Sequence, residues 1–198
     1  MRADALTGRA VAVAVLLAVG CSTTSLSPPD TAVVEQLGQA VVRAGSGDVW
    51  AVVDYRYAAA NAGAEWLILE VAVTAADGRR FKLDRSDVFL RGPSGARYPL
   101  PTQQEFSLAY SDLRSAFRNA GVAASPLQAY FPSNRRPCSF QFFAPPGAGI
   151  TFDTVEINDR RACQARLPFL VPGGVQPGRW VLGIDLEESR LRVPFDLT

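Results

Sequence analysis

The residues able to do acid–base or metal chemistry are few, and the most suggestive are close pairs of carboxylates. Two facing carboxylates can serve a glycosidase, and a dense acidic loop with glycine can bind calcium through about six to eight oxygens. Three such pairs occur: Asp84 with Asp87, Asp153 with Glu156, and Asp185 with Glu187. None lies in a loop dense enough for calcium. We therefore predict that they are solvated strand edges or turn caps.

The chain contains no histidine, which removes Ser-His, Cys-His and His-metal sites from the candidates. Lys82 is the only lysine, and the surrounding Arg80–Asp84 segment has the alternation of a half-exposed strand. No nucleophile motif lies near Lys82. These residue types predict a protein that is not an enzyme and that needs no metal or cofactor.

Charge gives little support to a nucleic-acid partner. Twenty basic and 19 acidic residues leave a formal net charge of +1 over 198 residues. A nearly neutral chain has no long-range field to attract an anionic polymer, and no run of Lys or Arg creates a local one. Nucleic acid is therefore not an expected partner.

The first 21 residues have the composition of an export signal. A basic start with Arg2 and Arg9 precedes the uncharged apolar run Ala10–Val19, which ends at Ala18-Val19-Gly20-Cys21. The run is too short for a membrane-spanning helix, which needs about 20 apolar residues. It resembles a bacterial lipoprotein signal (lipobox), in which cleavage precedes a cysteine that has already been diacylated.

The lipobox resemblance implies a signal peptide over residues 1–20, lipid such as palmitate on Cys21, and attachment to a membrane of the cell envelope through that lipid. Ser22 follows the acylated cysteine where an Asp would favour retention at the inner membrane. The expected location is therefore the outer membrane, facing the periplasm or the surface, if the organism is Gram-negative.

Two further cysteines, Cys138 and Cys163, are expected to form a disulfide bond, because an isolated thiol pair outside the cytoplasm tends to be oxidised. The bond would close a loop of about 25 residues, which the chain-entropy model values at about 3.5 kcal/mol. A redox-active pair would need CxxC spacing, which is absent. Two buried free thiols are the remaining alternative.

Residues 21–32 are rich in small polar residues and proline, and we interpret them as the acylated N-terminus and a flexible tether. One domain is expected over residues 33–198. Residues 33–42 fit either a helical stripe or a first strand at Ala40–Arg43, and we favour a strand preceded by irregular chain. From Val49 onward apolar residues alternate with period two, which indicates strands.

The predicted strands are separated by turns rich in glycine. Those before the middle of the chain cover Val49–Tyr57, Trp66–Thr74 and a short segment from Val88, with turns at Asp77-Gly78 and Arg91–Gly95. Later strands follow around Cys138–Phe142, Val155–Ile157 and Cys163–Phe169, and the last hairpin spans Trp180–Leu197. About seven to nine short strands with such turns predict a mainly β, immunoglobulin-like sandwich of antiparallel sheets.

Residues 102–120 interrupt this alternation with a helical pattern. Thr102 and Glu105 have the spacing of a capping box, and Gly121 is expected to end the helix. Apolar residues recur at three- and four-residue steps: Phe106, Ala109, Tyr110, Leu113, Phe117 and Ala120. We predict one inserted amphipathic helix that packs on the sheets, with a partner-binding stripe as the alternative.

The order of these strands resembles a known pattern. Paired strands at Val49–Tyr57 and Trp66–Thr74, then Val88-Phe89-Leu90 leading to Gly95-Ala96-Arg97-Tyr98-Pro99, are similar to the telokin-like, immunoglobulin-type domains of uncharacterised bacterial envelope lipoproteins. The likeness covers Gly38 to the C-terminus, and the helix and the cysteine pair depart from it. It implies a binding or scaffolding module without catalytic residues.

The most site-like segment is Tyr130–Pro137, which combines aromatic residues with arginines in a stretch full of turn formers. We predict that Tyr130, Phe131, Arg135 and Arg136 bind a partner, and the alternative is that the aromatics fix the loop to the core. The predicted function is a lipid-anchored module that binds or scaffolds another envelope protein. A module for lipid or glycan and a histidine-free carboxylate hydrolase are the alternatives.

Overall fold

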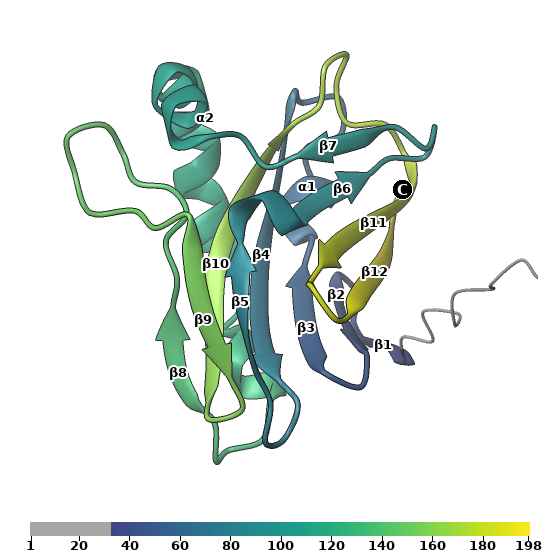
Figure 1. The fold of residues 1–198 in the computed structure, drawn as a ribbon. Helices are drawn as coiled ribbons and strands as arrows, with labels where there is room; N and C mark the ends of the chain where they lie inside the picture. The colour runs from purple at the N-terminus through teal and green to yellow at the C-terminus, as the bar shows by residue number, and fades with distance from the viewer. Residues whose placement is uncertain (1–32) are drawn as a thin grey trace, which may run out of the picture.

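The computed structural model describes residues 33–198, so the predicted signal peptide, Cys21 and the predicted tether lie outside the described residues. Two layers of β-strands face each other, and one long helix lies beside them (Figure 1). The expected mainly β class with several antiparallel sheets is confirmed.

One layer is a six-stranded sheet in the order β1-β2-β3-β4-β10-β8. The strands are β1 (Val33–Gly38), β2 (Val41–Gly45), β3 (Val49–Asp54), β4 (Trp66–Ala75), β8 (Arg136–Ser139) and β10 (Arg161–Leu170). Neighbouring strands are antiparallel except for β8, which runs parallel to β10 at the sheet edge. The central strands β4 and β10 pair from Trp66 opposite Leu170 to Val73 opposite Cys163.

The second layer consists of a four-stranded sheet in the order β12-β11-β6-β7 and a separate pair, β5 with β9. Its strands are β5 (Arg80–Asp84), β6 (Val88–Arg91), β7 (Arg97–Pro99), β9 (Thr154–Asn158), β11 (Gly178–Asp185) and β12 (Arg190–Leu197). The 3-10 turn η1 (Arg85–Asp87) connects β5 to β6. The layer is therefore divided between β5 and the β11–β12 hairpin (Figure 1).

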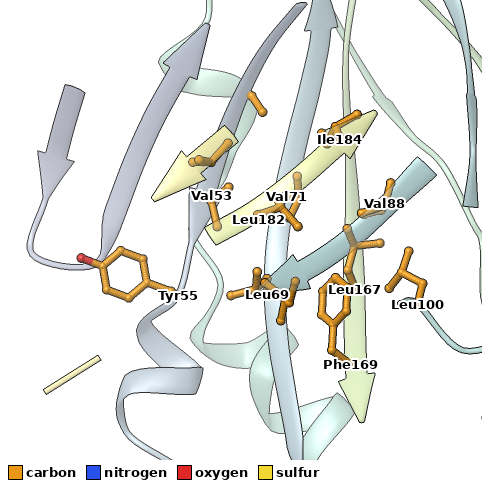
Figure 2. Packing of buried hydrophobic residues seen from close by; sticks show 14 of the residues in the cluster. Val53, Tyr55, Leu69, Val71, Val88, Leu100, Leu167, Phe169, Leu182 and Ile184 are labelled. Atoms are coloured by element: carbon orange, nitrogen blue, oxygen red, sulfur yellow. The ribbon is translucent and has the colours of Figure 1, made fainter. Parts of the chain in front are cut away.

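The main hydrophobic core fills the space between the two layers. Figure 2 shows Leu69 and Val71 of β4 close to Leu182 and Ile184 of β11. These side chains are at most 1% exposed. Burial of one such side chain is worth about 1.5–3 kcal/mol, so these contacts between β4 and β11 stabilise the packing of the two layers.

The strand predicted over Val49–Tyr57 ends earlier, at Asp54, and a short helix α1 (Arg56–Ala59) follows. The Asp54 carboxylate accepts a hydrogen bond from the Arg56 backbone N–H at 2.9 Å, which turns the chain out of the extended conformation. Tyr55 remains buried and stacks on Phe195 with ring centroids 5.0 Å apart. Tyr55 therefore continues the apolar pattern of β3 because its ring packs in the core just after the strand ends.

Two further strands differ from the sequence prediction. The expected irregular chain before Ala40 is the strand β1, which pairs with β2 in register from Val33 opposite Gly45. The predicted turn at Arg91–Gly95 is followed by the short strand β7, which was not predicted and which pairs with β6. Both are edge strands, and hydrogen bonds to a single neighbour hold them, so their own sequence patterns are weak.

The helical pattern after Thr102 corresponds to α2 (Gln103–Ala123), and both halves of the capping box are formed. The Glu105 backbone N–H donates to Thr102 Oγ1 at 3.1 Å, and the Thr102 N–H donates to the Glu105 carboxylate at 2.7 Å. The predicted stop at Gly121 is wrong, because α2 continues to Ala123. A Cβ at Gly121 would lie 2.2 Å from the Arg166 guanidinium, so this glycine permits close packing instead.

The apolar stripe of α2 is packed inside the molecule. Phe106, Leu113 and Ala120 are at most 2% exposed, and α2 contacts β4 and β10. A second 3-10 turn, η2 (Leu127–Tyr130), follows α2 and packs on the same sheet. Within residues 33–198, the structure holds no helix that is both long and apolar enough to cross a bilayer.

Candidate functional site

Two side chains of the predicted binding segment Tyr130–Pro137, those of Phe131 and Arg135, are turned into the molecule, whereas Pro132–Asn134, Arg136 and Pro137 are exposed. Phe131 is 8% exposed and belongs to a small apolar cluster on the outer side of the six-stranded sheet. The other buried members of this cluster are Val41, Val52, Ala72, Leu127 and Ala162. Tyr130 is half-buried against them, and Arg136 is exposed on β8. Phe131 therefore fixes the loop to the sheet.

Arg135 is also an internal residue, with a side chain that is 7% exposed. Its Nη1 donates to Thr74 Oγ1 and to the Ala75 carbonyl at 2.8 Å each, and to the Asp159 carbonyl. Its Nη2 pairs with Asp77 at 2.8 Å. Arg135 therefore connects three chain segments. Binding of a partner by this segment stays a prediction, for which Tyr130 and Arg136 are the accessible members.

The Cys138–Cys163 disulfide bond is present, and it joins β8 to β10. The two residues are direct partners in the parallel pairing, with Cα atoms 4.3 Å apart. β8 makes only four residue pairs with β10 and none with another strand. The bond therefore holds a short edge strand, and the segment Tyr130–Pro137 before it, against the sheet.

The carboxylate pairs do not all lie apart, because two of them border the same surface hollow. This charged hollow has a volume of about 560 Å³ and lies between β5 and the β11–β12 turn. Its lining residues are Asp48, Arg79, Arg80, Phe81, Lys82, Asp84, Asp87, Asp185, Leu186, Glu187, Glu188 and Ser189. Asp153 and Glu156 are not among them. Asp153 pairs with Arg85 at 3.0 Å instead.

Each central carboxylate of the charged hollow already has a partner. Asp87 accepts a hydrogen bond from the Asp84 backbone N–H at 2.9 Å, and Asp84 accepts one from the Thr154 hydroxyl. Asp185 pairs with Arg192 at 2.5 Å and with Arg97 at 3.6 Å. In residues 33–198, no three Asp, Glu, Cys or His side chains are grouped so as to hold a metal ion.

Burial raises the pKa of Asp87, and the nearby carboxylates of Asp84 and Asp185 raise it further, although the hydrogen bond from the Asp84 backbone lowers it. A carboxyl group with a raised pKa beside an ionised one is the arrangement that a glycosidase uses. Here the same groups cap η1 and form ion pairs. Their geometry is therefore explained by turn formation, as the sequence predicted.

Buried charges under α2 anchor that helix to the sheet. Glu70 is 6% exposed and pairs with Arg166, whose Nη1 donates to the Phe117 carbonyl of α2 at 2.9 Å. Asp54 accepts a hydrogen bond from the Ser125 N–H at 3.2 Å, just after the helix. These charged groups are internally satisfied, so they position α2 and are not free to act on a ligand.

An apolar groove lies where β7, the first turns of α2 and the ends of β4 and β10 meet. This distal groove has a volume of about 450 Å³ and is lined by Trp66, Arg97, Tyr98, Pro99, Leu100, Pro101, Glu105, Ala109, Leu170 and Pro172. Only two of these ten residues are charged, Arg97 and Glu105. A concave apolar surface with a few polar groups at its border is the usual form of a binding site.

The distal groove leaves large apolar side chains open to solvent. Leu170 is 44% exposed, and Trp66 opposite it in the β4–β10 pairing is half-buried. Leu108 of α2, which follows Glu105 by three residues but is not part of the groove lining, is 78% exposed. Contiguous exposed apolar surface on a domain with a well-filled core indicates a place where something binds.

The distal groove lies far from the end of the sheet at which the described chain begins. Val33, Gly45, Trp50 and Thr74 are successive partners across β1, β2, β3 and β4. Eight residues of β4 separate Thr74 from Trp66, a distance of about 26 Å at 3.3 Å per residue. Figure 1 shows the same separation, with the start of β1 at the lower right and β7 and α2 at the top.

Comparisons with known proteins add no family assignment. No protein-family model matches the chain, and neither the curated proteins nor the solved structures contain a match. The site must therefore be judged on the contacts of its own residues.

Sequence reasoning did not find the distal groove, because its residues come from four separate segments and none has a motif. Trp66 and Leu170 appear in the sequence as the ends of two ordinary strands. The available signal was the gathering of prolines around Tyr98 and after Leu170, at Pro99, Pro101 and Pro172. Such prolines restrict the backbone of an exposed segment, but they do not indicate which other segments lie next to it.

Proposed function

We propose that the protein is a lipid-anchored protein of the cell envelope that acts by binding another envelope protein, and that the distal groove is its binding surface. The observation that carries this proposal is the exposed apolar lining of the groove, with Leu170 44% exposed beside Trp66. The lipobox resemblance at Ala18–Cys21 supports the lipid anchor, and Ser22 after the cysteine supports the expected outer-membrane location.

The position of the groove supports this arrangement. A lipid on Cys21 would hold the domain through a tether of about a dozen residues that leads into β1. The groove lies about 26 Å along β4 from that end of the sheet. A domain held in this way presents Trp66 and Tyr98 away from its own membrane, toward proteins of the periplasm or the cell wall.

Binding is favoured over catalysis because the carboxylates of the charged hollow have partners within the protein. Asp84, Asp87 and Asp185 each have a hydrogen bond or an ion pair within the protein. A carboxylate hydrolase would need two of them free to face a substrate. The apolar groove, in contrast, has a face that no other side chain of residues 33–198 fills.

We also propose that the sandwich is of the immunoglobulin type with α2 as an insertion. The two antiparallel layers and the closing β11–β12 hairpin support this proposal. The parallel pairing of β8 with β10 is a departure, and the disulfide bond stabilises it. The part of the chain between β7 and β9 is then the region that was added to the basic domain.

Two measurements test the proposed function in cells of the source organism. A photoreactive amino acid at position 66 of the full-length protein is expected to cross-link to a discrete partner, and the same group at position 122, on exposed α2 surface, is not. Cys21→Ser is expected to move the protein out of the membrane fraction and to abolish fatty-acid labelling. Equal cross-linking at both positions, or membrane attachment without Cys21, would contradict the proposal.

A further inference from the structure

The chemistry of the distal groove narrows the kind of partner that it fits, if the groove is the binding surface proposed above. Trp66 and Tyr98 are the aromatic residues of the lining, and Leu170 and Ala109 are among its aliphatic residues. Three lining residues are prolines, whose rings have fixed backbone angles and lose little entropy when a ligand binds. A rigid apolar groove with aromatic walls favours a ligand that is itself rigid and extended.

The edge of β7 is a poor template for strand addition. Leu90 pairs with Tyr98, Gly92 N donates to the Ala96 carbonyl, and Leu100 N donates to the Val88 carbonyl. The backbone groups of Arg97 and Pro99 therefore point to the free side of the strand. Proline has no N–H, so this edge offers a single donor. An extended ligand must then bind mainly through its side chains.

A proline-rich segment in the polyproline II conformation is rigid and extended, and it can bind through its side chains without backbone hydrogen bonds. It makes no internal hydrogen bonds, it is stiff before binding, and its rings pack into grooves lined by Trp and Tyr. A β-strand ligand, in contrast, would lose the ladder hydrogen bonds that normally stabilise it.

Charge at the border of the groove indicates what else the ligand carries. Arg97 already pairs with Asp185 at 3.6 Å and lies over the Phe89 ring at 3.4 Å. Glu105 has no salt-bridge partner within 4.0 Å among residues 33–198. Hydrogen bonds from the Thr102 backbone and side chain lower the pKa of Glu105, so it is ionised at neutral pH. A Lys or Arg of the ligand near Glu105 would therefore be complementary in charge to this carboxylate, whose second oxygen is not used by the capping hydrogen bond from Thr102.

The ligand comes from another molecule. The chain has two proline pairs of its own, and the second, Pro145-Pro146, does not line the groove. The first, Pro28-Pro29, is four residue steps before Val33, which span at most about 14 Å. The groove is about 26 Å from that end of the sheet. The Pro28-Pro29 pair therefore cannot reach the groove of the same chain.

We propose that the distal groove binds an extended, proline-rich segment of another envelope protein, and that a Lys or Arg of this segment pairs with Glu105. Trp66 and Tyr98 pack against the proline rings, and Glu105 sets the direction in which the segment lies. The proposal deepens the proposed function and depends on it.

The test uses the mature full-length protein in detergent and a fluorescein-labelled polyproline peptide ending in arginine. The matched probes are the same peptide with alanine in place of proline and the same peptide ending in glutamine. We expect the polyproline-arginine peptide to bind at least about tenfold more tightly than the alanine peptide. Equal binding of the two peptides would overturn the proposal.

Variants connect the binding to named residues. Trp66→Leu and Leu170→Ser are expected to weaken binding at least about tenfold, whereas Val122→Ser, at an exposed position outside the groove, leaves it unchanged. The melting temperature of each variant separates loss of binding from loss of folding. If neither groove variant weakens binding, the groove is not the site.

Glu105→Gln tests the ion pair, because glutamine can keep the capping box while removing the charge. This substitution is expected to lower the affinity for the peptide ending in arginine about threefold to tenfold. It is expected to leave the affinity for the peptide ending in glutamine unchanged. An equal effect on both peptides would show a structural role and would reject the ion pair.

The remaining outcomes distinguish the two proposals. Cross-linking at position 66 in cells without binding of proline-rich peptides would leave the proposed function in place and reject this inference. If neither cross-linking at position 66 nor binding of proline-rich peptides is observed, the proposed function and this inference are both rejected. A dimer that forms at the same concentrations and is lost in Leu170→Ser would identify a second copy of the chain as the occupant of the groove. This result would also reject the proposed proline-rich ligand.

Discussion

The segment Tyr130–Pro137 and the distal groove contain the same kinds of residue, namely aromatics, prolines and arginine, yet these residues are used in opposite ways. In the segment, Phe131 fills an apolar cluster and Arg135 donates to three internal acceptors. In the groove, Trp66 and Leu170 leave apolar surface open to solvent. The first region stabilises the fold, and the second leaves part of its surface without a partner.

Amino-acid composition therefore does not distinguish a loop that binds a partner from a loop that is fixed to the core. What distinguishes them is whether each polar group and each apolar face already has a partner in the protein. The free energy of unfolding separates the two regions experimentally. Substitutions in the anchored segment should lower it strongly, and substitutions in the groove should change binding with little effect on it.

The largest effect is expected for Phe131→Ala. The side chain is 8% exposed in the small cluster on the outer sheet face, and truncation of a buried Phe costs about 3–5 kcal/mol. Urea denaturation of the full-length protein measures this loss. A loss below about 1 kcal/mol would place Phe131 at the surface and would favour the original binding prediction for it.

Removal of the disulfide bond should cost nearly as much. The chain-entropy model assigns about 3.5 kcal/mol to a loop of this length, and the Cys138→Ser, Cys163→Ser double variant should show that loss in the same assay. Because β8 has no other strand neighbour than β10, its amides should also exchange faster with solvent. Unchanged exchange on β8 would show that the pairing does not need the bond.

Arg135→Ala should cost about 3 kcal/mol, because three acceptors lose one buried donor group and each unmet bond costs about 1–3 kcal/mol. The adjacent Arg136→Ala is the matched control, since Arg136 is exposed, and it should change stability by less than about 0.5 kcal/mol. Thermal denaturation of the two variants side by side gives the answer. Similar losses for both would mean that Arg135 is not an anchor.

A smaller effect is expected at the start of α2, which borders the groove. Thr102→Ala removes the side-chain cap and should cost about 1 kcal/mol. Because the pKa of Glu105 is lowered in the folded protein, its contribution is present above the usual pKa of glutamate and is lost as pH falls through the folded value. The stability difference between the wild type and Glu105→Gln should therefore vanish on acidification.

The smallest effect on stability is expected in the groove itself. Leu170→Ser changes a side chain that is already 44% exposed and should alter the free energy of unfolding by about 0.5 kcal/mol or less. The same variant should show the loss of peptide binding described above. A stability loss of several kcal/mol would mean that the groove is an anchored surface like Tyr130–Pro137, and the contrast between the two regions would disappear.

Much of the fold could be predicted from local patterns. Period-two alternation located β4, β10 and the β11–β12 hairpin, because each has one face in the core. The Thr102–Glu105 spacing located the start of α2. Edge strands β1 and β7 were not predicted, since hydrogen bonds to one neighbour determine them more than their own side chains do. Gly121 was misread because its role depends on Arg166, which is distant in the sequence.

Of the candidate sites, the sequence predicted the Cys138–Cys163 bond and the turn-forming roles of Asp84 and Asp87, while the roles of Phe131 and Arg135 depended on partners from other strands. The sequence by itself determined the β-rich class, the helix start and the cysteine pair, because these follow from periodicity and from chemistry between few residues. Only the tertiary structure decided which aromatics and arginines are buried and where apolar surface stays open. Burial is a property of several segments packed together, and no single segment contains it.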